Sequence, residues 1–219
     1  MDRFHNVNLR FLTGMLLKTY HRNPGKRFLL GLTGIPGAGK STIAGKLMNS
    51  VNRACSQDLA IVVPMDGFHL TNDSLIERNL LARKGIPETF DALGFIGLLQ
   101  RIVLDGESEI GCPAYDRRIH NPVANAILVE KKHRIVIVEG NYLLLDREPW
   151  NQLEGLFDET WFIDARLPVI QQRLVKRHLR SGRTQEEAAK KVSSTDMPNA
   201  KLILRTRDRA DKVIRVQEW

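Results

Sequence analysis

The sequence predicts a doubly wound α/β fold with a mainly parallel sheet, and three observations lead to this prediction. Short apolar runs alternate with segments of helical spacing along the chain, as in parallel strands joined by helices. The run RIVIVE at 134–139 is apolar almost throughout, as expected of a strand buried on both faces. The first apolar run, at 27–33, leads into a glycine-rich turn. Ligands of such folds bind beyond the carboxyl ends of the strands, so functional residues are expected there.

Each element is predicted from its own pattern. Phe4, Phe11, Leu12 and Tyr20 belong to a helical apolar stripe, so a leading helix is expected within 1–26. A proline ends the second predicted strand, and an aspartate at 91 is a suitable N-cap for the helix that follows it. The predicted strands are 27–33, 59–64, 126–130, 134–139, 160–163 and 212–216, and the further predicted helices are 41–52, 71–83, 92–104, 167–180 and 185–192.

The composition excludes several classes of protein. With 42% hydrophobic residues and 16 glycines the chain is about half apolar, which excludes disorder and collagen-like repeats. No apolar run approaches the roughly 20 residues that cross a bilayer, so no membrane partner is expected. Two cysteines, Cys55 and Cys112, fit reduced thiols in the cytoplasm. The basic N-terminal segment resembles a transit peptide in charge, but its helical stripe and lack of serine favour a docked helix.

The charge balance points to anionic partners. Lys+Arg total 33 against 25 Asp+Glu, a net charge of +8. This excess attracts nucleic acid, phospholipid or nucleotide phosphate alike, so the charge alone does not choose among them.

Residues 34–41, GIPGAGKS, match the phosphate-loop pattern G-x-x-x-x-G-K-[ST], between a predicted strand and a predicted helix. Such a loop points its backbone N–H groups at phosphate oxygens; its lysine reaches the β- and γ-phosphates, and its serine ligates Mg²⁺. A glycine-rich turn with a capping serine is the alternative, which leaves the lysine unexplained. The expected nucleotide-binding residues of the loop are Gly34, Pro36, Gly37, Ala38, Gly39, Lys40, Ser41 and Thr42.

Two carboxylates follow predicted strands. Asp66 comes after the second strand, where it could accept the proton of an acceptor hydroxyl or hold the metal; alternatively Asp66-Gly67 is only a turn. Glu139 ends the strand 134–139 and is placed to bind Mg²⁺ directly or through water; a solvated strand-end glutamate is the alternative. The chain has no Asn-Lys-x-Asp motif and no D-x-x-G at switch spacing, which disfavours a guanine-nucleotide switch.

Basic side chains cluster near the predicted helix 167–180. Arg173, Lys176, Arg177 and Arg180 have i, i+3, i+4 and i+7 spacing, and Arg183 follows them. Arginines that close over a transferred phosphoryl group stabilise its charge and exclude water. A solvated face or a nucleic-acid surface would show a similar charge run. The low aromatic content, 6%, disfavours base stacking on nucleic acid.

Taken together, several motifs resemble the superfamily of phosphoribulokinase, uridine kinase and pantothenate kinase. They look most like its nucleoside/nucleotide kinase-like subgroup, of the fructose-transport-system kinase type. The resemblance implies a sheet of the P-loop NTPase type with a helical lid. The matching segments are GIPGAGKST at 34–42, PMDGFHL at 64–70, RKGIPETFDALGF at 83–95, PAYDRRIH at 113–120, IVEGNYLLLD at 137–146 and the basic stretch 166–183.

The same resemblance implies roles for individual residues. The aspartate matching Asp66 is the catalytic base in that superfamily, and His69 lines the acceptor pocket. PAYDRRIH is similar to the uridine kinase segment P-x-Y-D-x-x-x-H, although D-G-F-H at 66–69 differs from the D-S-F-Y of uridine kinases. The expected catalytic residues are Asp66, Lys40, Arg173 and Arg177; the expected metal ligands are Ser41, Glu139 and Asp66; Arg183 adds to the nucleotide-binding set.

The candidate acceptor residues also have structural interpretations. His69 could be a structural histidine, and the segment around Tyr115 could be a β-hairpin with a surface tyrosine. Arg83 or Lys84 could hold an anionic substrate group or lie on a solvated helix end. The expected substrate-binding residues are His69, Arg83, Tyr115, Arg117 and His120.

No repeat or linker divides the chain, so one domain is expected over 1–219. Its expected parts are the leading helix 1–26, a nucleotide and acceptor core 27–165, a basic lid 166–195 and a closing segment 196–219. The leading hypothesis is an ATP- and Mg²⁺-dependent kinase acting on a hydroxyl of a sugar, nucleoside or pantothenate-like alcohol. The alternatives are a nucleic-acid-dependent ATPase and a nucleotide-sensing regulator without transfer. Nucleotide and a small-molecule acceptor are the expected partners, nucleic acid is not, and a homodimer stays open.

Overall fold

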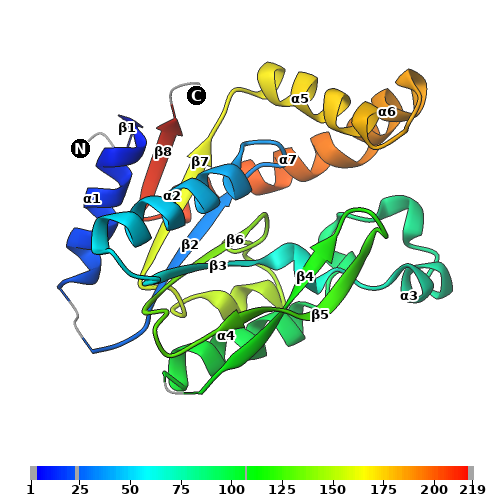
Figure 1. Cartoon of the computed structure of the whole chain (residues 1–219). Coiled ribbons are helices and arrows are strands. Elements are labelled where there is room, and N and C mark those ends of the chain that lie inside the picture. The colour runs from blue at the N-terminus through cyan, green and yellow to red at the C-terminus, as the bar shows by residue number, and fades with distance from the viewer. Residues whose placement is uncertain (1–3, 23–24, 107, 217–219) are drawn as a thin grey trace.

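The computed structural model describes residues 4–22, 25–106 and 108–216, and its centre is a six-stranded parallel sheet (Figure 1). The strands lie in the order β1-β8-β7-β2-β6-β3, and every neighbouring pair is parallel. The expected doubly wound α/β class is confirmed. The bounds are β1 (Phe4–Val7), β2 (Phe28–Gly34), β3 (Ala60–Pro64), β6 (Ile135–Gly140), β7 (Glu159–Asp164) and β8 (Lys212–Val216).

Helices cover both faces of the sheet, with α1 and α2 on one face and α4 on the other (Figure 1). Every residue of the central strands β2 and β6 is buried, as their apolar sequences predict. The helices begin at side-chain caps where the sequence supplies them: Asp91 accepts from the N–H of Gly94 at 2.9 Å. The helices are α1 (Leu9–Tyr20), α2 (Lys40–Cys55), α3 (Asn72–Glu77), α4 (Ala92–Leu104), α5 (Leu167–Arg180), α6 (Gln185–Lys191) and α7 (Met197–Leu204).

A separate antiparallel ribbon is formed by β4 (Ile110–Asp116) and β5 (Asn121–Val129). The strand predicted at 126–130 is therefore the end of β5, outside the parallel sheet. The ribbon packs on the 3₁₀ turn Met65–Phe68 that follows β3. A Cβ on Gly67 would lie 2.2 Å from the carbonyl oxygen of Pro113, so only glycine permits this close approach. The ribbon is thus held beside the carboxyl end of β3.

The N-terminal prediction is corrected in part. Residues 4–7, expected to begin the leading helix, form β1, which pairs in parallel with β8 at the edge of the sheet. The helix α1 starts only at Leu9, where Asn8 caps it by accepting from the N–H of Phe11 at 3.0 Å. Residues 1–3 and 23–24 of the predicted 1–26 segment lie outside the described residues.

Local backbone geometry corrects one further predicted helix, and one helix of the structure was not predicted. The helix expected over 71–83 ends at Glu77, because Asn79 takes a left-handed conformation at φ 56° and closes the helix end. Leu80 N–H then donates to Leu75 O at 2.8 Å. The helix α6 runs into a π-helical turn, Val192–Asp196, and then into α7, which no sequence pattern had indicated in the closing segment.

Among the helices of the described residues, none is long and apolar enough to span a membrane.

One buried arginine ties the sheet to α4 and to the ribbon. The guanidinium of Arg27, 4% exposed, donates to five backbone carbonyls. They belong to His133, Ile102, Asp105, Gly106 and Glu130, at 2.7–3.3 Å. A planar fork of donors suits this arrangement, whereas an ammonium offers only three donors at one point.

We expect Arg27→Lys to lower the free energy of unfolding by about 3 kcal/mol, because at least two buried carbonyls lose a charged donor. Urea denaturation of the purified protein measures this change. Arg10→Lys on the exposed face of α1 is the matched control and should change stability by less than about 0.5 kcal/mol. Equal effects of the two substitutions would contradict the role of Arg27.

Candidate active site

The phosphate loop connects β2 to α2, and its glycines have backbone angles that other residues avoid. The φ angles are 149° at Gly34, 79° at Gly37 and 93° at Gly39. A Cβ on Gly34 would also lie 2.6 Å from the carbonyl oxygen of Ile163 in β7. The loop therefore needs glycine both for its curl and for its approach to the neighbouring strand. Pro36 and Ala38 are buried within it, and Thr42 is exposed in the first turn of α2.

The ammonium group of Lys40 is buried within this loop. Its Nζ donates to the carbonyls of Gly34 at 3.0 Å and Ile35 at 3.2 Å, and to Oδ1 of Asn141 at 2.6 Å. Burial lowers the pKa of Lys40 to about 8, while the negative charges of Glu139 and Asp66 oppose that shift. Asn141 had not been singled out from the sequence, although it directly follows the Glu-Gly that ends β6.

Glu139 and Ser41 meet beside the lysine. The hydroxyl of Ser41 donates to Oε1 of Glu139 at 2.9 Å. Burial, followed by the nearby charge of Asp66, raises the pKa of Glu139. The register of β3 against β6 pairs Pro64 with Glu139, so Asp66 follows two residues beyond this pair. The parallel sheet thus brings the two carboxylates to the same edge.

The side-chain oxygens of Ser41, Glu139 and Asp66 are hard donors of the kind that Mg²⁺ prefers. Within 4–22, 25–106 and 108–216, no group of three or more His, Cys, Asp or Glu side chains could enclose a metal ion.

His69 lies close to Asp66, in an aromatic cluster. Its ring stacks on Phe90 with centroids 3.9 Å apart and meets the edge of Tyr115 at 5.0 Å. Burial lowers the pKa of His69 to about 4, so the ring is neutral near pH 7. Its Nε2 is 4.0 Å from Oδ1 of Asp66, a polar contact with a neutral ring. The side chain of Asp66 keeps 39% exposure and remains accessible.

Tyr115 and His120 flank the turn of the β4–β5 ribbon. The ammonium of Lys84 lies 5.1 Å from the centre of the Tyr115 ring. It donates to the carbonyl of His120 at 2.8 Å and to Oδ1 of Asn72 at 2.7 Å. Burial, followed by the charge of Asp66, raises the pKa of Tyr115. His120 therefore contributes its backbone carbonyl to this region, at a φ of 52°.

The two remaining basic acceptor candidates are exposed. Arg117 is close enough for its charge to act on Glu139 and Tyr115. Arg83 instead lies near enough to Glu88 for their charges to interact, and Glu88 pairs with Arg147 at 2.6 Å. Of the pair Arg83 and Lys84, the structure thus brings Lys84 to Tyr115.

The lid helix α5 lies directly over the phosphate loop. A Cβ on Gly37 would lie 3.3 Å from the side chain of Leu174, which is buried together with Ile170. Arg177, one turn later, pairs with Asp196 at 3.7 Å, and its charge acts on Lys40. Arg183 lies close enough to Tyr115 for their charges to interact.

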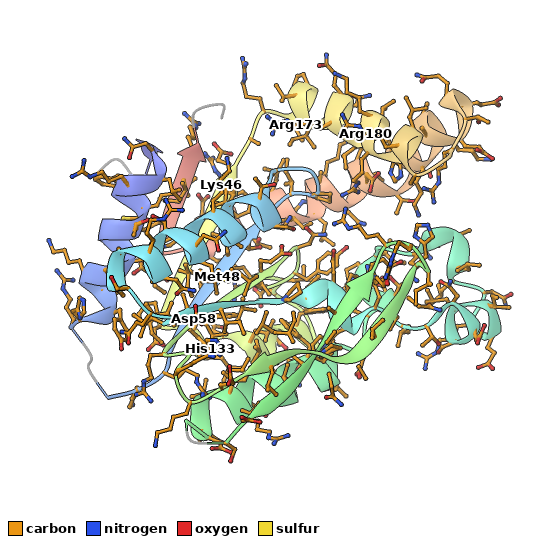
Figure 2. The ribbon with its side chains drawn as sticks, in the orientation of Figure 1. Lys46, Met48, Asp58, His133, Arg173 and Arg180 are labelled. Atoms are coloured by element: carbon orange, nitrogen blue, oxygen red, sulfur yellow. The ribbon has the colours of Figure 1, made fainter. Side chains whose placement is uncertain are left out.

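Arg173 and Arg180 are exposed along α5 (Figure 2). Figure 2 also shows that Asp58 and His133 lie next to each other at the other end of the molecule, near the start of β3. Of the predicted lid arginines, Arg177 pairs with Asp196 and Arg183 contacts His178, while Arg173 is exposed on α5. Sequence reasoning missed His178, Lys191 and Asp196, whose contacts join segments 18 or more residues apart.

Comparison with known proteins shows the family to which the chain belongs. The model of the Phosphoribulokinase / Uridine kinase family matches residues 29–218. "Uncharacterized protein YggC" of Escherichia coli K12 is 34% identical over 217 residues, 99% of this chain and 89% of that protein. "Putative uridine kinase C227.14" of Schizosaccharomyces pombe is 37% identical over 180 residues, 80% of this chain and 77% of that protein.

Solved structures share the fold. The crystal structure of the "putative fructose transport system kinase from Silicibacter sp. TM1040" superposes with a TM-score of 0.87 at 35% identity. It covers 95% of this chain and 99% of that one. YFH7 from Saccharomyces cerevisiae, at 22% identity and a TM-score of 0.84, covers 97% of this chain and all of its own, and it shares the fold. The resemblance expected from the sequence motifs is confirmed: this chain belongs to the phosphoribulokinase/uridine kinase family.

Proposed function

We propose that this protein is a kinase that transfers the γ-phosphoryl group of ATP to a hydroxyl group of a small metabolite. One observation carries the proposal: Asp66 is accessible and lies close to two differently built groups of residues. The first group is the buried Lys40 and Glu139 of the phosphate loop region. The second is the aromatic cluster of His69 and Tyr115. A carboxylate in this position can take the proton of a hydroxyl that attacks a phosphate.

In the proposed reaction, the phosphate loop holds the triphosphate. Its backbone N–H groups and the start of α2 favour negative charge. The ammonium of Lys40, already held by two carbonyls and Asn141, neutralises charge on the outer phosphates. Because Lys40 is preorganised and buried, its interaction with phosphate is stronger than in water.

Ser41 and Glu139, with Asp66, would hold Mg²⁺. When bound, the ion would neutralise phosphate charge that develops during transfer. Before any ion binds, the hydrogen bond from Ser41 to Glu139 already fixes the position of one carboxylate oxygen at the site.

The acceptor would bind against the wall that His69 and Tyr115 form together, with its hydroxyl at Asp66. The neutral ring of His69 and the face of Tyr115 offer an amphipathic wall that suits a sugar or other polyol. Lys84, Arg117 and His120 lie at the rim of this wall. The negative charge of the transferred phosphoryl group would be neutralised by Arg177 and Arg183 of the lid. Arg173 would join them when the lid closes further, and the closed lid would exclude water.

The family supports an ATP-dependent kinase over the two alternatives considered from the sequence, nucleic-acid-dependent hydrolysis and sensing without transfer. The aromatic cluster beside Asp66, where an acceptor would bind, also favours phosphoryl transfer over these two alternatives.

Asp66→Asn should leave ATP affinity within about twofold and reduce transfer by about 10³-fold, because the variant loses the proton acceptor but not the phosphate loop. ADP release is measured with a coupled assay over a panel of metabolite alcohols, with Lys40→Ala as the blank. Turnover at the wild-type rate with an acceptor found in this screen would contradict the role of Asp66.

The affinity for MgATP should fall as pH rises through about 8. The protonated form of Lys40 binds phosphate, and its pKa in the free protein is lowered to about 8. The affinity for MgATP is therefore highest below that pH and falls above it. We expect the Kd to rise about tenfold between pH 7 and pH 9. Calorimetric titration across this range tests the expectation.

The matched variant is Lys40→Arg, whose guanidinium stays charged throughout. Its affinity should be weaker but constant over the same pH range. A flat profile for the wild-type protein would show that the titration of Lys40 does not govern binding.

A further inference from the structure

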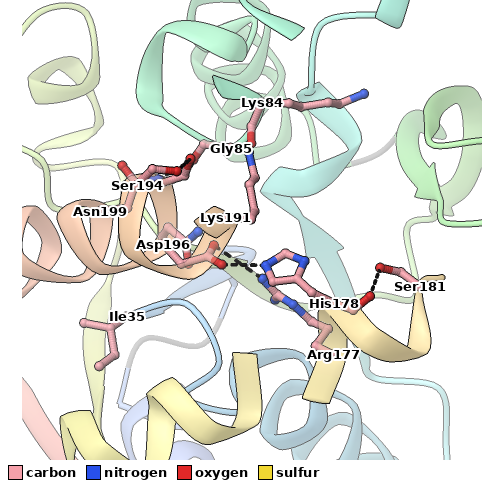
Figure 3. A network of polar contacts seen from close by, with 12 residues as sticks. Ile35, Lys84, Gly85, Arg177, His178, Ser181, Lys191, Ser194, Asp196 and Asn199 are labelled. Carbon is pink, nitrogen blue, oxygen red and sulfur yellow. Dashed lines mark hydrogen bonds and ion pairs between the residues drawn. The ribbon is translucent and has the colours of Figure 1, made fainter. Parts of the chain in front are cut away.

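A buried cluster of ionisable side chains joins the lid helix α5 to the turn before α7 (Figure 3). Asp196 and His178 are each 7% exposed. Oδ2 of Asp196 is 2.6 Å from Nε2 of His178, and its Oδ1 is 3.7 Å from Nη2 of Arg177. The two oxygens of one carboxylate are therefore divided between two neighbouring residues of α5.

The same cluster extends to Arg183 through the imidazole ring. Nη1 of Arg183 lies 3.3 Å from Nδ1 of His178 and 3.1 Å from Oγ of Ser181. A guanidinium has only donors, so Nδ1 of His178 must accept and carries no proton. The proton then resides on Nε2, which donates to Asp196. The chain of contacts from Asp196 through His178 to Arg183 thus requires one tautomer.

Asp196 itself is anchored on the body of the protein. It ends the π-helical turn Val192–Asp196, a local geometry that is common at functional sites. On either side of this turn, Lys191 donates to the carbonyls of Ala82 and Lys84 at 3.0 Å each, and Asn199 donates to the carbonyl of Gly85 at 2.9 Å. Figure 3 shows Lys191 reaching from this turn towards Lys84 and Gly85 while Asp196 faces His178 and Arg177.

Arg177 belongs to the part of α5 that covers the phosphate loop, and the charge of Arg183 acts on Tyr115. Leu174, which packs over Gly37, is less than one helical turn from Arg177. An exposed arginine side chain samples many rotamers, and fixing it in advance lowers the entropic cost of contacting a phosphate.

We propose that Asp196 is a positioning residue that orients Arg177 directly, and Arg183 through His178, towards the terminal phosphate. The proposal rests on the proposed function, because it assumes that these arginines contact the γ-phosphate. It predicts that loss of Asp196 weakens binding of the triphosphate selectively, whereas a residue that merely stabilises the lid would affect ATP and ADP alike.

Asp196→Asn tests this selectivity. An amide has one acceptor oxygen and one donor group, so it can satisfy His178 or Arg177 but not both. With Mg²⁺ present, calorimetry should show an about tenfold higher Kd for a non-hydrolysable ATP analogue and less than a twofold change for ADP. Asp58→Asn, far from the lid, is the control and should leave both values unchanged (Figure 2). Equal weakening of both nucleotides, or no weakening, would overturn the proposal.

A double-mutant cycle shows whether Asp196 acts through the arginine. In an Arg177→Gln background, Asp196→Asn should change the ratio of ATP to ADP affinity less than it does in the wild-type protein, since only the branch through His178 and Arg183 is left to lose. Full additivity of the two effects on this ratio would overturn the proposal.

If Asp196→Asn does not fold, the wild-type protein still provides a test. Side-chain ¹⁵N spectra of His178 should show a protonated Nε2 and an unprotonated Nδ1; a proton on Nδ1 would break the contact to Arg183 and overturn the proposal. Failure of the proposed function is a separate outcome, recognised when the wild-type protein binds no ATP or transfers no phosphoryl group in the acceptor screen.

Discussion

The buried ammonium of Lys40 is the interaction on which the site depends. It costs energy to keep this charge out of water, and the lowered pKa of about 8 records that cost. Two loop carbonyls, Asn141 and the nearby Glu139 and Asp66 offset it without neutralising it completely. In the proposed reaction a triphosphate brings further negative charge to this ammonium, and Mg²⁺ and the arginines of α5 would balance the rest.

The parallel sheet supplies the geometry around that charge. Because β3 and β6 run side by side with Pro64 opposite Glu139, residues that follow their ends meet at one edge. The ribbon β4–β5 packs beside this edge, and its contact with Gly67 fixes it against the turn that carries Asp66. Helix α5 packs over Gly37 of the phosphate loop. Two halves of different chemistry, one charged and one aromatic, therefore share a single carboxylate.

Local signals in the sequence predict much of this fold. The apolar runs identify β2, β3, β6 and β7, and the spacing of glycine, lysine and serine identifies the phosphate loop. Other elements depend on partners that the local pattern does not contain. Residues 4–7 become a strand only because β8 lies beside them, and β5 leaves the parallel sheet because it pairs with β4. The helix expected over 71–83 stops early at the left-handed Asn79.

The residues of the candidate site also fall into those that local motifs predict and those that they do not. Lys40, Ser41, Asp66 and Glu139 could be named from motifs, because each follows a recognisable strand. Asn141, His178 and Asp196 could not be assigned a role, because their contacts join distant segments or depend on a π-helical turn. Lys84, rather than Arg83, faces Tyr115 for the same reason: the choice between adjacent residues is made by the turn of the backbone.

A crystal structure of the protein with Mg²⁺ and a non-hydrolysable ATP analogue would show where the terminal phosphate binds. We expect this phosphate to contact the ammonium of Lys40 and to lie between Glu139 and Asp66, with the carboxylate of Asp66 facing the open side where an acceptor hydroxyl would approach. A terminal phosphate remote from both carboxylates, with the nucleotide bound elsewhere on the molecule, would contradict it.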